Sequence, residues 1–215
     1  MKMLNQRQID RMLQKLERFE HTLERYYFEQ VGEVAMRAYP SDGSDREIPD
    51  DGLFQPVEKG WQWGGEGSYC WFKGEFTVPD ALAGQNLFLR PHCVGYESLL
   101  WVNGVPFGTF CNKILVNDHG NHYCNLIRKN AKAGETVAVA LESYAGHYVM
   151  GTAPFSEDER PSYRYPYNGA EICVKNEEII AFAFDLHTVR QLACVLPISS
   201  FRRGDLINVL THVHE

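Results

Sequence analysis

Long apolar runs and a surplus of positive charge are both missing from this sequence. No segment of the 215 residues approaches the length of a membrane span, and the opening stretch MKMLNQRQIDRMLQKLERF has no apolar core or small-residue cleavage site of a signal peptide. The formal net charge of −7 opposes binding to a phosphate backbone, which lysine and arginine must neutralise. We therefore expect a cytoplasmic protein that contacts neither nucleic acid nor a membrane.

Paired metal-binding cysteines are also missing. The sequence has 6 cysteines but no C-x-x-C motif. Because no export signal is visible, reduced and buried thiols are expected rather than a disulfide framework. The cysteines are Cys70, Cys93, Cys111, Cys124, Cys173 and Cys194.

Familiar catalytic motifs are absent as well. The sequence contains no G-x-S-x-G, no G-x-G-x-x-G and no P-loop, which removes the usual signals for a serine hydrolase and for nucleotide binding. Glycoside hydrolysis requires two carboxylates, and Glu97 and Glu142 lie near predicted strands. With 28 acidic residues any pair can be nominated, so these two are equally well interpreted as solvent-facing strand residues.

A cluster of metal-binding residue types occurs in DHGNHYC, residues 118–124. Zinc accepts histidine, cysteine and aspartate, so His119 and His122 are candidate ligands. Their spacing follows no established zinc pattern, and Gly120 with Asn121 predicts a turn between strands. A polar loop is the preferred interpretation, and a metal-binding jelly roll that uses the two histidines is the weaker alternative.

Helical periodicity marks both ends of the sequence. In residues 1–38 apolar side chains recur at three- and four-residue spacings among charged ones, which predicts an N-terminal helical segment. In residues 185–215, Asp185 is the predicted cap of one helix, Pro197 its stop and Asp205 the start of a second. The second pattern continues to the last residue, so 185–215 is expected to begin a connection to a further domain.

Residues 39–184 predict β-structure. The turn-rich stretch PSDGSDREIPDDG opens the region, and short apolar runs follow at close intervals without a helical pattern between them. Such spacing is typical of an antiparallel β-sandwich or jelly roll, so the fold is expected to be mainly β with flanking helices. The predicted strands are 69–78, 86–92, 98–102, 107–110, 113–116, 136–144, 170–174 and 179–183.

The stretch YESLLWVNGVPFG predicts a hairpin. Asn103-Gly104 favours a type I′ turn, whose central residues both have positive φ. In the preceding strand 98–102, Leu100 lies on one face and Trp101 on the other. Because both faces are apolar, we expect a scaffold strand that is covered on both sides.

Aromatic residues make up 13% of the sequence, and several form a candidate carbohydrate platform. Flat apolar faces of sugars stack on aromatic rings, so Trp61, Trp63, Trp71 and Tyr165 are candidate carbohydrate-binding residues. Packing in the sandwich core competes with this role, because aromatic rings supply much of the buried area of such domains. For any one tryptophan, core packing is the preferred interpretation.

An ordered set of segments resembles a known family. The run from WGGEGSYCWFKGEF to LLWVNGVPFG contains W-F-x-x-x-F-x-V-P, then L-F-L-R, then W-V-N-G-x-P-x-G, and VAVALESYAGHY follows. This order resembles the N-terminal β-sandwich of glycoside hydrolase family 38 α-mannosidases, in the bacterial and yeast-vacuolar-type branch. The resemblance implies a galactose-binding-domain-like sandwich, and it extends over the helical flanks.

The resemblance also implies which chemistry belongs elsewhere. Family 38 enzymes hydrolyse α-mannosides with retention at a zinc centre, with an aspartate nucleophile, and their zinc ligands begin with a His-x-Asp motif. This sequence contains no His-x-Asp, so no catalytic or zinc residue of the family can be assigned to it. No cofactor is expected in this chain, and zinc is expected in a catalytic domain that is missing from it.

Two classes of function follow. The first is a non-catalytic N-terminal domain of a zinc-dependent α-mannosidase, which packs on the catalytic domain as a scaffold and supports subunit contacts in a homo-oligomer. The second is a free-standing carbohydrate-binding module, or the accessory domain of another glycosidase such as a family 2 β-galactosidase, since the hairpin also resembles that family. Apolar helices at both ends of the chain favour the first.

Overall fold

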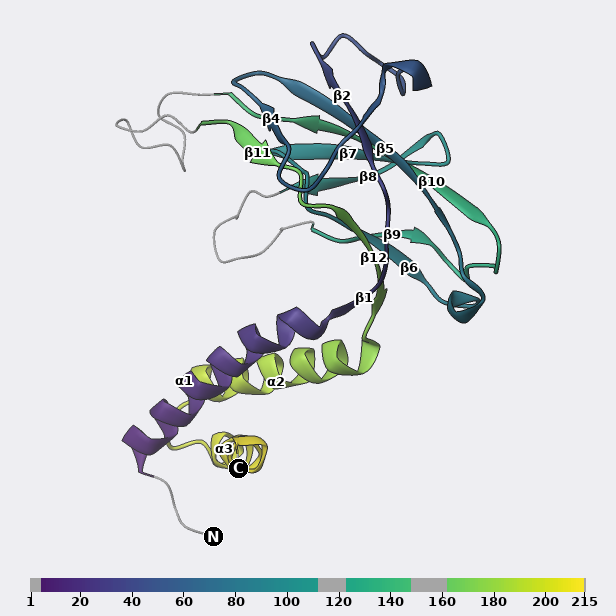
Figure 1. Cartoon of the computed structure of the whole chain (residues 1–215). Helices are drawn as coiled ribbons and strands as arrows, with labels where there is room; N and C mark the ends of the chain where they lie inside the picture. The colour runs from purple at the N-terminus through teal and green to yellow at the C-terminus, as the bar shows by residue number, and fades with distance from the viewer. Residues whose placement is uncertain (1–4, 112–122, 148–161, 215) are drawn as a thin grey trace. The chain divides into compact units, whose positions relative to one another are not determined.

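The computed structural model describes residues 5–111, 123–147 and 162–214 (Figure 1). The chain divides into two compact units. The sandwich unit is Gln30–Val174, and the helical unit joins Met1–Glu29 to Lys175–Glu215. The helical unit therefore takes its helices from both ends of the sequence.

Three α-helices form the helical unit: α1 (Gln6–Leu23), α2 (Glu177–Val195) and α3 (Phe201–His214). A short 3₁₀ turn, η1 (Glu24–Tyr26), follows α1. The side chains of Asn5 and Gln8 each accept a hydrogen bond from the other's backbone N–H, which starts α1 with a capping box. The described helices include none that is long and apolar enough to cross a membrane.

One apolar core holds these helices together. Their buried faces bring together side chains at helical spacing, so the amphipathic pattern expected in the N-terminal segment is confirmed. The core residues are Met12, Leu13, Leu16, Leu23, Ala183, Leu186, Ala193, Ile207 and Leu210.

Helix α2 begins earlier than its sequence predicts. The strand expected at 179–183 is wrong, as is the helix start at Asp185, because α2 already begins at Glu177. Asn176 caps the helix by accepting a hydrogen bond from the backbone N–H of Ile179 at 3.2 Å. The run of apolar residues that follows is buried on one side only, and an apolar run of this length does not distinguish a strand from a helix.

The N-terminal segment is shorter than predicted as a helix. Residues 1–38 were expected to be helical, but α1 ends at Leu23 and strand β1 starts at Phe28. Val34 and Met36, which follow β1, are buried in the sandwich core. The sequence of β1 gives a weak strand signal because β1 is an edge strand with little burial.

The described strands form two main sheets and one short ladder. The small sheet has the order β1-β12-β6-β9, the large sheet β3-β2-β5-β10-β7-β8, and the ladder β11-β4. The predicted strand 113–116 lies outside the described residues. The strands are β1 (Phe28–Glu33), β2 (Arg37–Ser41), β3 (Gln55–Pro56), β4 (Gln62–Gly64), β5 (Tyr69–Thr77), β6 (Leu87–Pro91), β7 (Glu97–Val102), β8 (Val105–Cys111), β9 (Asn125–Arg128), β10 (Thr136–Tyr144), β11 (Arg164–Pro166) and β12 (Ala170–Lys175).

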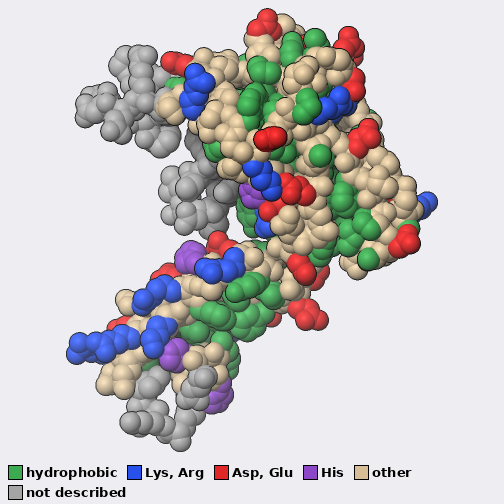
Figure 2. Space-filling model, viewed as in Figure 1, with side chains coloured by type: hydrophobic (Ala, Val, Ile, Leu, Met, Phe, Trp, Pro, Cys, Tyr) green, Lys and Arg blue, Asp and Glu red, His purple; other side chains and the backbone are tan. Residues whose placement is uncertain are grey.

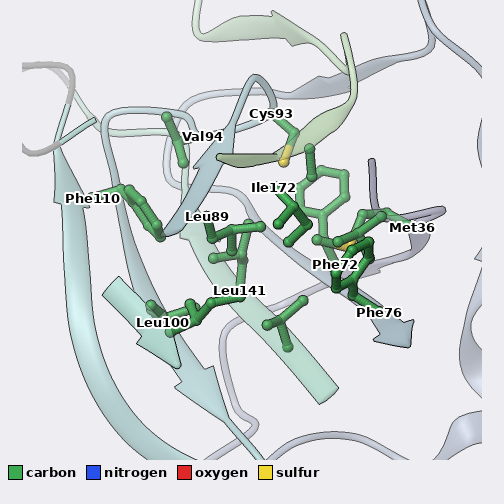
Figure 3. Close-up of a cluster of buried hydrophobic side chains, with 14 of the residues drawn as sticks. Met36, Phe72, Phe76, Leu89, Cys93, Val94, Leu100, Phe110, Leu141 and Ile172 are labelled. Atoms are coloured by element: carbon green, nitrogen blue, oxygen red, sulfur yellow. The ribbon is translucent and has the colours of Figure 1, made fainter. Parts of the chain in front are cut away.

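Strand β10 runs through the middle of the large sheet. It pairs antiparallel with β5 along its whole length, from Thr136 opposite Thr77 to Tyr144 opposite Tyr69, and with β7 on its other side. Its inward residues, such as Leu141, contact the core formed with the small sheet, where Leu89 and Ile172 are fully buried (Figure 3). Each such aliphatic or aromatic side chain stabilises the fold by about 1.5–3 kcal/mol. The expected antiparallel sandwich is confirmed.

The outer face of the large sheet is covered as well. Trp71 and Trp101 lie there with ring centroids 5.9 Å apart, and Phe54 covers them from the segment that leads into β3. Leu100, on the same strand as Trp101, points into the opposite core and is completely buried. The prediction that strand 98–102 is covered on both faces is confirmed.

The hairpin between β7 and β8 has the predicted turn geometry. Asn103 has φ of 50° and Gly104 of 79°, the positive values that a type I′ turn requires at both positions. Asn103 also holds the turn to β10, because its side-chain oxygen accepts a hydrogen bond from the N–H of Ala138 at 3.0 Å and its own N–H donates to the Ala138 carbonyl at 2.8 Å.

A buried ion pair joins the two ends of the chain inside the helical unit. The Arg190 guanidinium on α2 donates to both carboxylate oxygens of Glu20 on α1, at 2.6 and 2.9 Å. The two side chains are only 7% and 11% exposed. The Glu20 carboxylate raises the pKa of Arg190 further, so this arginine stays charged and needs its partner.

Gly104→Ala is predicted to destabilise the sandwich by about 1 kcal/mol, because an L side chain disfavours the positive φ of this residue. A Cβ added at Gly104 or at Gly52 would have no other residue's atom within 4 Å, so neither change creates a clash. Gly52→Ala is therefore the control, since Gly52 has no positive φ. Urea denaturation followed by tryptophan fluorescence measures both, and equal losses would contradict the backbone explanation.

Glu20→Ala is predicted to destabilise the helical unit by about 3 kcal/mol, because it leaves the buried Arg190 charge without its bidentate partner. Glu17→Ala is the matched control. Glu17 also contacts Arg190, at 3.3 Å, but its side chain is 50% exposed, so its loss should cost less than about 1 kcal/mol. Helical circular dichroism in urea reports both variants, and a similar loss in the two would refute this ranking.

Candidate functional site

Three of the four predicted carbohydrate-binding aromatics meet in the sandwich unit. Trp61 and Trp63 both lie edge-on to Phe72, with ring centroids 6.4 and 5.7 Å from it. Tyr165, which pairs with Trp63 across the β11–β4 ladder, has its ring centroid 5.4 Å from that of Trp63. The structure thus brings Trp61, Trp63 and Tyr165 together, around a core phenylalanine.

Burial limits what these rings can do. Trp63 is 3% exposed, and its indole N–H donates to the carbonyl of Cys93 at 3.1 Å. Trp71, the fourth predicted residue, is completely buried on the outer face of the large sheet. A sugar needs a free ring face, which neither of these two tryptophans offers. Trp61 and Tyr165 are partly buried against the core, and the Tyr165 hydroxyl donates to the carbonyl of Ala145 at 2.8 Å.

The predicted alternative metal site cannot be placed. His119 and His122 lie outside the described residues. Among the residues that are described, no group of three or more histidine, cysteine, aspartate or glutamate side chains is arranged to hold a metal ion. The described residues therefore do not fit a zinc centre.

The cysteines behave as packing residues. All six are free thiols; Cys70, Cys93 and Cys173 are buried, whereas Cys194 is exposed. Burial raises the pKa of Cys70 to about 12, which keeps it protonated and unreactive at neutral pH. The expectation of buried thiols holds for three of the six.

A groove lies on the outer face of the large sheet, beside the covered tryptophans. We call it the outer-face groove. It has a volume of about 350 Å³, within the range of small-molecule sites. Strands β5, β10, β7 and β8 each contribute to it, and most of its side chains come from alternate positions that point away from the sandwich core, whereas Ser98 and Phe110 lie at inward positions. The groove is lined by Tyr69, Glu97, Leu99, Thr109, Glu142 and Tyr144, together with Ser98, Phe110 and Cys111.

Two tyrosines and two carboxylates set the chemistry of this groove. Tyr144 lies opposite Tyr69 on one side and opposite Glu97 on the other, and the two tyrosine rings are 4.8 Å apart. The Tyr144 hydroxyl is 2.6 Å from Nδ1 of His147. Burial raises the pKa of Tyr144, with further contributions from Tyr69 and Glu97. The arrangement offers aromatic surface next to hydrogen-bond acceptors.

From the sequence, Glu97 and Glu142 are identified only as two acids near predicted strands; Tyr69 belongs to the aromatic cluster of the first half of the chain, and Tyr144 was not predicted as a site residue. Both tyrosines terminate correctly predicted strands, Tyr69 at the start of β5 and Tyr144 at the end of β10. Because side chains alternate between the two faces of a strand, the sequence can predict which sheet face each tyrosine lies on. The register that sets them opposite one another depends on which strands pair, and the sequence does not contain that information locally.

A second surface is apolar and lies at the turn between α2 and α3. Val195, Ile198 and Phe201 are 76%, 74% and 85% exposed, and we call them the apolar corner. Phe184, three helical turns before Val195 on α2, is 69% exposed. Figure 2 shows apolar side chains gathered over the part of the helical unit where α2 lies. Such a concentration of exposed large apolar groups is a candidate interaction surface.

Comparison with known families gives one strong match. The family model for the alpha-mannosidase jelly roll domain matches residues 40–167, which is more than half of the chain. The match spans the sandwich unit from the end of β2 to the segment after β11. No curated protein matches the chain in sequence.

Solved structures give weaker similarities. The chain is similar to Faecalibacterium prausnitzii beta-glucuronidase, at 15% identity and a TM-score of 0.44, over 70% of this chain and 32% of that one. It is also similar to Ruminococcus gnavus beta-glucuronidase, at 12% identity and a TM-score of 0.43, over 70% of this chain and 29% of that one. The chain thus spans about a third of the length of these enzymes.

Proposed function

The chain belongs to the alpha-mannosidase jelly roll domain family, and from that premise we propose that it is the non-catalytic N-terminal domain of a zinc-dependent α-mannosidase. Its role is to pack against the catalytic domain as a scaffold. Retaining hydrolysis of α-mannosides is then carried out by the catalytic domain. The zinc ion belongs to that domain too.

The main support for the scaffolding role is the exposure of the apolar corner. Full burial of a valine, isoleucine or phenylalanine side chain stabilises a contact by about 1.5–3 kcal/mol, and these three residues are mostly exposed within this chain. Three such side chains within seven residues of sequence offer a compact anchor of the kind that dominates protein interfaces. A carbohydrate-binding module that works alone has no use for such an anchor.

The catalytic domain is the proposed occupant of the apolar corner. The corner lies downstream of the jelly roll, on helices that follow β12 directly. A domain connected through these helices is held at high effective concentration next to them, which favours docking at the corner over docking of an unconnected partner. A second copy of the chain, as in a homo-oligomer, is the alternative occupant of the corner, and the docking experiment below distinguishes the two.

The alternative parent, a family 2 glycosidase, has less support. The family match is to an α-mannosidase domain. The similarity to beta-glucuronidases is limited to structures of low identity, with TM-scores below those that indicate a shared fold in detail. We therefore retain the α-mannosidase as the parent enzyme.

The purified chain is predicted to release no nitrophenol above the blank from p-nitrophenyl α-mannoside, with or without added zinc. The reason is that the catalytic groups are assigned to another domain. Absorbance at alkaline pH measures the product. Turnover by the chain that is abolished by one substitution in it would overturn the proposal of a non-catalytic domain.

Phe201→Asp is predicted to weaken docking to the catalytic domain by roughly tenfold or more, because it puts a charge at the centre of the apolar contact. The wild-type chain and the variant are each co-expressed with an α-mannosidase catalytic domain as a separate polypeptide, and the affinity is measured by surface plasmon resonance. The thermal midpoint of the chain should stay nearly unchanged, since Phe201 is 85% exposed.

Val105→Asp is the control for this experiment. Val105 is 61% exposed at the β7–β8 hairpin of the sandwich unit. The Val105→Asp substitution therefore adds the same charge at an exposed apolar side chain outside the corner. Equal effects of the two variants would overturn the docking role of the corner. If the Phe201 variant instead dissociates a dimer of the chain and leaves binding to the catalytic domain intact, the corner is a contact between copies.

A further inference from the structure

The outer-face groove combines aromatic surface with a carboxylate that has no hydrogen-bond donor. Because residues two apart on a strand share a face, Glu142 lies on the same face as Tyr144, and it is opposite Leu99 and Trp71 on the neighbouring strands. No described residue donates a hydrogen bond to its carboxylate. Glu142 is half-buried, and its oxygens are not among the buried unpaired atoms of the described residues, so they are accessible to a ligand in the groove.

Two buried indole nitrogens on this face have no hydrogen-bond partner among the described residues. The indole nitrogens of Trp71 and Trp101 are buried, and within the described chain neither has a hydrogen-bond partner. Trp71 is completely buried and is the direct cross-strand neighbour of Glu142. Buried polar groups are normally paired, so two unpaired indole N–H groups on one sheet face are unusual, although neither tryptophan lines the groove. Burial also raises the pKa of Glu142, consistent with its incomplete solvation.

We propose that the outer-face groove binds a neutral hexopyranoside. The Glu142 carboxylate accepts hydrogen bonds from sugar hydroxyls, and Glu97 and the Thr109 hydroxyl reach the same groove from β7 and β8. Tyr69 and Tyr144 supply the apolar surface against which the C–H face of the sugar packs. These are the features of a small polar ligand site: an apolar floor with a few fixed polar groups.

A cation is the main competitor for two carboxylates, and the groove fits it less well. Within the described residues, no third metal-binding side chain joins Glu97 and Glu142 in a group that can hold a metal ion. The Arg46 guanidinium already places a positive charge near Glu142, although the Asp45 carboxylate opposes it. A sugar, unlike a cation, does not need a site of net negative charge. Its hydroxyls donate hydrogen bonds to the carboxylate, and its C–H face packs on the tyrosine rings.

The choice of sugar rests on the proposed function, whereas the groove itself does not. Because the family is that of α-mannosidases, methyl α-mannoside is the first probe, and methyl β-glucoside tests whether the groove accepts hexopyranosides generally. Docking of the catalytic domain is measured through the apolar corner, on the helical unit. A failure of sugar binding therefore leaves the scaffolding role intact, and a failure of docking leaves the groove intact.

Glu142→Gln is predicted to weaken binding of methyl α-mannoside to the full chain by about tenfold or more, because it replaces charge-assisted hydrogen bonds by neutral ones. Tyr144→Ala should have a similar effect through loss of the ring surface. Saturation-transfer NMR and chemical-shift titration measure the affinities. Glu75→Gln is the matched control, since Glu75 is an exposed residue of β5 on the same face and does not line the groove.

Each outcome bears on the proposal. Weaker binding in Glu142→Gln and Tyr144→Ala, with unchanged binding in Glu75→Gln, supports it, whether the sugar bound is the mannoside alone or both sugars. Thermal melting and proton NMR spectra confirm that each variant is folded. The proposal is overturned if the wild-type chain binds neither sugar at concentrations up to tens of millimolar, a range set by the affinity scale. It is also overturned if the groove variants bind like the wild type, or if calcium alone binds at Glu97 and Glu142.

Discussion

The requirement that both faces of β10 be covered organises the sandwich unit. Val137, Val139 and Leu141 point into the core shared with the small sheet, while Ala140 lies under Trp71 and Trp101 on the other face. The strand can be central only because a second layer covers each side, the small sheet on one and the segment that contains Phe54 on the other. Apolar cover on the outer face ends at Glu142 and Tyr144, and the outer-face groove occupies that position.

The helical unit adds a different constraint, which is that the two ends of the chain must meet. The bidentate contact between Arg190 and Glu20 ties α1 to α2 within their common apolar core. A buried ion pair adds little net stability, but it penalises any packing that separates its partners. The unit therefore has a defined arrangement of helices, and a defined arrangement is what allows the apolar corner to serve as an anchor.

The two surfaces divide the work that we propose for this domain. The apolar corner has three large exposed apolar side chains, so it suits a protein partner. The outer-face groove is small and carries carboxylates and tyrosines, so it suits a sugar. A domain with both features can be fixed to a mannosidase and can also contact glycan, although neither task requires catalytic residues in this chain.

The sequence by itself determined the long strands, the hairpin turn and the family. Alternation predicted β5 to within one residue and β10 at its observed bounds, and Asn103-Gly104 predicted the turn, because strand periodicity and positive φ are local properties. The apolar run at 179–183 was misassigned, since its helix depends on the cap at Asn176 and on packing against α1.

Only the tertiary structure decided which aromatic residues are buried and which polar residues meet. Trp63 and Trp71 were candidates for sugar binding with core packing preferred, and the pairing of the strands places both in packed layers. Glu97, Glu142 and the two tyrosines come from three strands, and their proximity follows from the register among β5, β10 and β7. Register is set by long-range packing, which no local stretch of sequence encodes.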